Sequence, residues 1–75
     1  MYTYRIGLIP RDSSKNLSDL CKKNKCTLEV AGSEDGMNDV YIEADSIDKI
    51  KSVARQSWFR FYPEFIYDCE KNDFI

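Results

Sequence analysis

The feature that most constrains the fold of this chain is the order in which two hydrophobic periods occur along it. Residues 2–9 alternate with the period of two that suits a β-strand, and the apolar positions of residues 17–24 recur at helical spacing. Alternation returns in residues 26–31 and 38–44, and a second helical stripe follows in residues 47–58. The sequence therefore predicts strand, helix, strand, strand and helix, in that order.

Local signals bound the first two of these elements. The first strand should bury one face and end at Pro10, and polar residues that commonly cap helices follow it. We expect the buried face of the strand to consist of Tyr2, Tyr4, Ile6 and Leu8, and the candidate helix caps to be Asp12, Ser13 and Ser14.

The second and third strands are separated by residues 32–36, which combine Gly, Ser, Glu, Asp and Gly in a turn-forming cluster. We expect these strands to form a hairpin. Asp45 and Ser46 should cap the second helix, whose apolar stripe runs from Ile47 to Trp58.

Residues 58–75 form an aromatic C-terminal segment. Pro63 interrupts any long element there, and residues 64–69 have the composition of a strand, so this stretch either returns to the sheet as an edge strand or ends loosely. Residues 1–57 are predicted to have the element order βαββα, and a strand in the C-terminal segment would complete the order βαββαβ. We predict a single α+β domain over residues 1–75 with a ferredoxin-like split βαβ fold, in which both helices cover one face of an antiparallel sheet.

The chain of 75 residues contains no histidine, which excludes Ser-His-Asp and Cys-His arrangements and metal sites built on two histidines. A chain this short holds one small core and rarely encloses a pocket that tunes a carboxylate or lysine for catalysis. We therefore predict a protein that is not an enzyme and has no cofactor.

Three cysteines, Cys21, Cys26 and Cys69, are an odd number without the spacing of a zinc knuckle. We expect reduced thiols in small core positions and no metal site. The chain lacks both the long uncharged stretch of a membrane span and the basic start of a signal peptide. These features lead us to expect a cytoplasmic protein.

The net charge of −2 conceals a strong sorting of charge along the chain. Residues 1–27 hold six basic and two acidic residues, residues 28–48 hold seven acidic residues and no basic one, and residues 49–60 hold four basic residues only. Such an acidic hairpin repels phosphate and attracts basic protein surfaces. The candidate binding residues are Glu29, Glu34, Asp35, Asp39, Glu43 and Asp45; the alternative is a solvated face balanced by basic helices.

Seven of the ten aromatic residues lie between Trp58 and Phe74. A small sheet and two helices cannot cover them all, so we expect Trp58, Phe61 and Phe65 to reach the core and the others to form a contact surface. Its partner would be another protein or a second copy in a homodimer; the alternative is a core built from large side chains. The candidate contact residues are Phe59, Arg60, Tyr62, Tyr67 and Phe74.

The layout of residues 3–55 resembles the ACT domains, regulatory domains that bind amino acids at the loop after their first strand. Arg11, Ser13 and Ser14 occupy that position here, where a helix N-terminus favours a small anion. The glycine that follows proline in the family is replaced by Arg11. The resemblance implies a ligand-sensing or oligomerising regulatory domain.

In size and charge layout, this short, acid-faced chain also resembles viral inhibitors that occupy the nucleic-acid-binding surfaces of host defence enzymes, anti-CRISPR proteins among them. That resemblance implies a partner protein with a basic surface, such as a nucleic-acid-handling enzyme. It implies no direct contact with nucleic acid or a membrane. We take this protein-binding inhibitor as the leading hypothesis and the ACT-like domain as its alternative.

Overall fold

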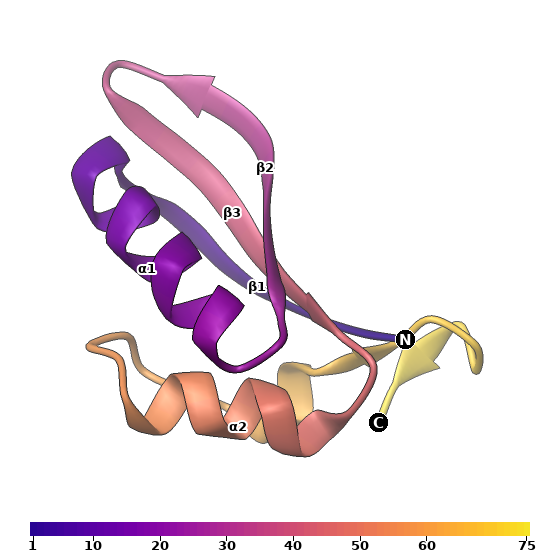
Figure 1. The fold of residues 1–75 in the computed structure, drawn as a ribbon. Coiled ribbons are helices and arrows are strands. Elements are labelled where there is room, and N and C mark those ends of the chain that lie inside the picture. Colours follow the sequence, from indigo (N-terminus) through magenta and orange to yellow (C-terminus); the bar gives the residue numbers. More distant parts are fainter.

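The computed structural model describes residues 1–75 as a five-stranded antiparallel sheet with two α-helices, which confirms the predicted α+β class (Figure 1). A short 3-10 helix, η1, follows the second α-helix. The elements are β1 (Tyr2–Pro10), α1 (Arg11–Lys23), β2 (Thr27–Glu34), β3 (Met37–Ala44), α2 (Ile47–Arg55), η1 (Pro63–Phe65), β4 (Tyr67–Asp68) and β5 (Asp73–Phe74).

The strands are ordered β2-β3-β1-β4-β5 across the sheet, so the sheet has one strand more than the four predicted. The expected edge strand over residues 64–69 is only the two-residue β4, which pairs with Tyr2 and Thr3 of β1. Asn72, at a positive φ of 59°, then helps to turn the chain back into β5. Most of the outer edge of β1 therefore has no neighbouring strand.

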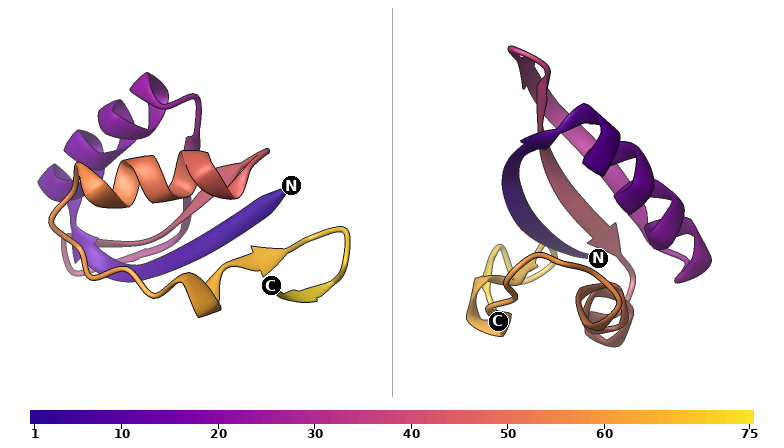
Figure 2. Two further views of the ribbon diagram at one scale, coloured as in Figure 1. Left: turned by 90° about the horizontal axis from the view of Figure 1, so that it is seen from below. Right: turned by 90° about the vertical axis from the view of Figure 1, so that its left-hand side faces the viewer.

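The hydrophobic core lies between the sheet and both helices, which Figure 2 shows on the same side of the sheet. From Val40 to Ala44 every second residue of β3 is buried, as the alternation predicted, because this strand pairs on both sides and packs under the helices. The C-terminal segment contributes one fully buried side chain, Ile66. The main sheet and helix residues of the core are Val40, Ile42, Ala44, Leu17, Cys21, Ile50 and Val53.

A β-bulge changes the phase of β1 and overturns the predicted burial of Leu8. Arg5 pairs with Tyr41 and Gly7 with Val40, so Ile6 is an extra residue on the β1 side. Gly7 has a φ of 102°, a conformation that residues with a Cβ rarely adopt. Beyond the bulge the two faces exchange: Ile9 is buried and Leu8 is 54% exposed.

Helix α1 begins earlier than predicted, immediately after Pro10, and no side chain caps it. Asp12, Ser13 and Ser14 therefore lie in its first turn. At its other end Lys25, at a φ of 58°, reverses the chain, and the Cys26 amide donates to the Cys21 carbonyl at 2.8 Å. This pattern is the Schellman motif, and it directs the chain from α1 into β2.

The hairpin between β2 and β3 turns more tightly than predicted. Only Asp35 and Gly36 connect the strands, both at positive φ, as a two-residue turn requires. Ser46 caps α2 as predicted, since its hydroxyl accepts a hydrogen bond from the Lys49 amide at 3.3 Å. Helix α2 ends at Arg55, so Trp58 does not belong to its buried stripe.

Neither helix combines the length and the apolar composition that a membrane crossing needs.

Candidate functional site

The sheet face opposite the helices gathers most of the candidate acidic residues. Residues paired across antiparallel strands share a face, and Thr27 pairs with Glu43, Glu29 with Tyr41, and Glu34 with Met37. In β3, Met37, Asp39, Tyr41 and Glu43 follow one another at intervals of two residues, so all four lie on one face. This open face carries four carboxylates, from Glu29, Glu34, Asp39 and Glu43.

The only basic side chain that the strand pairing places on the open face is Arg5, and it is bound to Asp39. The Arg5 Nη2 and Asp39 Oδ2 atoms are 2.6 Å apart, and Nε donates to Oδ1 at 3.3 Å. Glu29, Glu34 and Glu43 form no ion pair. Three carboxylates of the open face are therefore uncompensated by any intramolecular cation.

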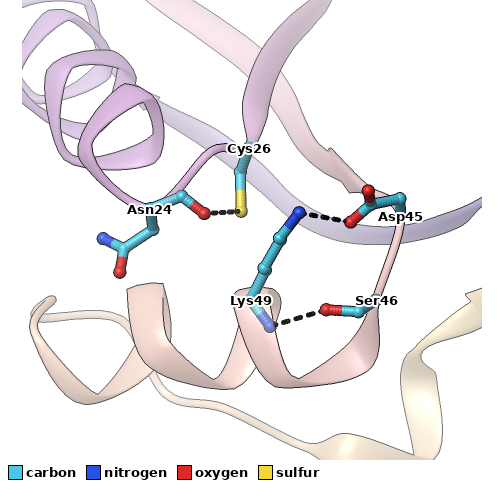
Figure 3. Close-up of polar contacts among 5 residues, drawn as sticks. All are labelled: Asn24, Cys26, Asp45, Ser46 and Lys49. Atoms are coloured by element: carbon cyan, nitrogen blue, oxygen red, sulfur yellow. Dashed lines mark hydrogen bonds and ion pairs between the residues drawn. The ribbon is translucent and has the colours of Figure 1, made fainter.

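Two of the candidate acidic residues lie off the open face. Asp35 is at the tip of the hairpin, next to Glu34, and is exposed. Asp45 lies beyond the end of β3, where its carboxylate is 2.6 Å from the Lys49 ammonium (Figure 3). The hydrogen bond from Lys49 and its positive charge lower the pKa of Asp45. Asp45 therefore serves the start of α2 and does not extend the open face.

The aromatic candidates lie along the unpaired edge of β1 and beyond its end, and they differ in burial. Phe59 packs against the core and stacks on Tyr4, with ring centroids 6.0 Å apart. Tyr62 is 41% exposed and Phe74 50% exposed, while Tyr67 is half-buried and meets Phe74 edge to face at 5.3 Å. Arg60 is exposed and forms no ion pair.

Two aromatic residues predicted in the core are instead exposed: Trp58 by 61% and Phe65 by 57%. Trp58 lies past the end of α2, and Phe65 ends the η1 turn, where the side chain that enters the core is that of the next residue, Ile66. Phe61 does pack against the core. The exposed aromatic surface therefore differs in membership from the predicted one: Trp58 and Phe65 join Tyr62 and Phe74, while Phe59 and Tyr67 are partly buried.

The C-terminal segment is attached to β1 through a buried tyrosine. The Tyr4 hydroxyl donates to the Arg60 carbonyl at 3.3 Å and accepts from the Tyr62 amide at 3.0 Å. These bonds hold residues 60–62 near β1 although no strand pairing joins them. An open groove of about 760 Å³ lies between β1 and residues 58–62.

Ile6 and Leu8 line this groove. Ile6 is partly buried and packs against the core, whereas Leu8, which the strict alternation placed on the same face as Tyr4, is exposed. Gly7 was the available signal, because a glycine inside a strand pattern often marks a bulge.

The cysteines differ in their surroundings. Cys21 and Cys26 are buried, as predicted, whereas Cys69 is exposed, which contradicts its predicted core position. Burial, and to a smaller extent the nearby Cys26, raises the pKa of Cys21 to about 12. Burial also raises the pKa of Cys26, whose thiol donates to the Asn24 carbonyl at 3.6 Å (Figure 3). Such buried thiols are structural and poorly nucleophilic.

The predicted anion-binding position falls in the first turn of α1. Ser14 is buried there, and its hydroxyl accepts a hydrogen bond from the Asn38 side-chain amide at 3.3 Å. Arg11 and Ser13 are at the surface or near it. The buried hydroxyl therefore links α1 to β3.

Comparison of the chain with protein-family models, with curated proteins and with solved structures found no match.

Proposed function

We propose that the protein is a non-enzymatic binding module that docks the open face of its sheet on a basic surface of a partner protein. The observation that carries the proposal is the set of three unpaired carboxylates, from Glu29, Glu34 and Glu43, on a face that no helix covers. Like charges gathered on one face cost stability, and a basic partner relieves their repulsion.

The partner class that fits this surface is a nucleic-acid-handling enzyme, because its basic groove already attracts polyanions. An acidic protein face bound there excludes the nucleic acid and inhibits the enzyme, as in the anti-CRISPR-like hypothesis. Tyr41 and the methylene groups of Arg5 lie among the carboxylates and offer apolar contact within the charged surface. The protein itself is not expected to contact nucleic acid.

We also infer that the fold is a variant of the ferredoxin-like split βαβ fold. The order β2-β3-β1-β4 places β1 and β3 between the other two strands, and β5 extends the sheet beyond the short β4. On this view the open face is the sheet surface that the two crossover helices leave uncovered.

The test replaces Glu29, Glu34 and Glu43 together by Gln and compares protein capture from a nuclease-treated lysate with that of the wild type. The matched control replaces three carboxylates away from the open face: Asp19→Asn, Glu64→Gln and Glu70→Gln. We expect the wild type and the control to capture the same basic proteins, and the face variant to lose them. Raised salt should release them as well, because screening weakens exposed charge pairs.

Equal capture by the face variant and the wild type would contradict the proposal. An ACT-like sensor would instead gain thermal stability when amino acids are added, with little response to salt. A thermal unfolding series with the amino acids therefore distinguishes the two functions.

A further inference from the structure

The groove beside β1 is bounded by a strand edge. Six consecutive residues of β1, from Tyr4 to Ile9, line one side of it, and residues of the C-terminal segment line the other. A wall made of consecutive strand residues exposes main chain as well as side chains. Six residues at about 3.3 Å each offer an edge of roughly 17–20 Å, which accommodates a short added strand.

The hydrogen-bond pattern shows which main-chain groups face the groove. The Met1 carbonyl accepts from the Cys69 amide, so Met1, Thr3 and Arg5 direct their main-chain groups toward the β4 side. Beyond the bulge, the Arg11 amide donates to the Gly36 carbonyl of the hairpin, and alternation then directs Leu8 away from β3. Strand β4 covers only Tyr2 and Thr3. The main-chain groups of Arg5 and Leu8 are therefore left without a partner strand.

The side chains along the groove are apolar and exposed. Leu8, Trp58, Phe65 and Phe74 line it, and each is at least half exposed. Contiguous apolar surface of this kind on a small protein marks an interaction site. A strand laid against β1 would cover these side chains with its own alternate residues.

The charged residues that line the groove indicate what kind of segment can bind there. Its twelve lining residues include Arg5 and Arg60 and no acidic residue, and Arg60 forms no ion pair. Arg5 is already paired with Asp39, so Arg60 is the unpaired cation of the groove. A symmetric dimer uses the same patch on both subunits and would bring two copies of Arg60 into an interface whose lining has no acidic residue. A segment that carries acidic residues is the complementary occupant.

We propose that this groove binds an extended segment of a partner protein, which adds to the edge of β1 as a strand. The segment alternates apolar residues, which cover the exposed aromatic side chains, with at least one acidic residue that pairs with Arg60. This site adjoins the acidic open face and shares Arg5 with it, but the proposal does not depend on the function proposed above.

The test uses a library of capped seven-residue peptides in which apolar residues alternate with Thr, Glu or Lys. We expect the retained peptides to carry Glu in preference to Lys, and a retained peptide to slow hydrogen exchange at the Arg5 and Leu8 amides. Methylation of alternate peptide nitrogens should abolish binding, since the added strand donates hydrogen bonds from its main chain.

Two substitutions of one residue each separate the groove from general charge effects. Arg60→Glu should weaken binding of the acidic peptide at least tenfold and shift selection toward Lys. Lys51→Glu on the exposed surface of α2 makes the same change of sign outside the groove and should leave the affinity unchanged.

Three results would overturn the proposal. The first is a library from which no peptide binds at millimolar concentration, and the second is a bound peptide that leaves exchange at Arg5 and Leu8 unchanged. The third is a concentration-dependent dimer of the free protein that protects these two amides, because a second copy would then be the occupant.

Discussion

The neighbouring residues Phe65 and Ile66 allow a sharp test of how the C-terminal segment is held in place. Ile66 is fully buried, whereas Phe65 is 57% exposed and meets Tyr62 edge to face at 5.9 Å. Truncating a buried isoleucine to alanine costs about 2–5 kcal/mol through lost transfer energy and the cavity that remains. A domain of 75 residues has a total stability of about 4–11 kcal/mol. Ile66→Ala should therefore remove a large part of the free energy of unfolding.

Phe65→Ala serves as the matched control and should cost clearly less than Ile66→Ala, because Phe65 is 57% exposed. Its edge-to-face contact with Tyr62 contributes about 0.5–1.5 kcal/mol beyond the burial of the covered part of the ring. The assay is urea unfolding of both variants, supported by thermal unfolding, in which Ile66→Ala should lower the melting temperature by at least about 8 °C. Ile66→Val should lie between wild type and Ile66→Ala, at a cost of about 0.5–1.5 kcal/mol. Equal unfolding free energies for Phe65→Ala and Ile66→Ala would refute the assignment of Ile66 as the buried anchor of this segment.

Three further predictions concern the bulge, the thiols and the start of α2. Gly7→Ala should cost about 1–3 kcal/mol, measured by urea unfolding, because φ is 102°, whereas Gly32→Ala meets no such strain and should be nearly neutral. Titration with a thiol reagent at neutral pH should modify exposed Cys69 and spare Cys21, whose pKa is raised to about 12 mainly by burial. Prompt reaction of all three thiols would contradict the burial of Cys21 and Cys26. Lys49, in the first turn of α2, holds the pKa of Asp45 below its usual 3.8. The free energy of unfolding of the wild type should therefore exceed that of Asp45→Asn above pH 3.8, and the difference should vanish as acid protonates the native carboxylate. A difference that grows in acid would contradict this reasoning.

The regular parts of the fold could be predicted because hydrophobic period and burial agree there. Val40, Ile42 and Ala44 follow strict alternation in a strand that is paired on both sides, and all three are buried. The alternation failed at Leu8 because one extra residue in β1 reverses every later side chain. A bulge depends on how two strands pair, so Gly7 indicates where one can form, but the sequence of β1 alone does not show that it does.

The candidate surfaces were predictable to different degrees for a similar reason. Residues separated by an even number of positions in a strand share a face, so Asp39 and Glu43, four residues apart, were assigned together from their spacing alone. The groove was not predictable, because it depends on the short β4 and on the η1 turn that exposes Phe65. Aromatic composition indicated a contact surface, but it could not show that the surface lies beside an open strand edge.

Arg5 belongs to both proposed surfaces. The strength of its ion pair with Asp39 therefore limits how much binding at one surface can change the affinity of the other. Its guanidinium binds Asp39 on the open face, while its main chain and part of its side chain line the groove. The Arg5 side chain is 75% exposed and that of Asp39 is 21% exposed, so solvent screens the guanidinium and the pair contributes on the order of 1 kcal/mol. A basic partner that displaces Arg5 from Asp39 therefore loses little free energy by breaking this ion pair. The released Arg5 can then join Arg60 in binding an acidic strand in the groove. Binding at the open face should then strengthen binding in the groove, by no more than about fivefold, because about 1 kcal/mol is the most that breaking this pair costs.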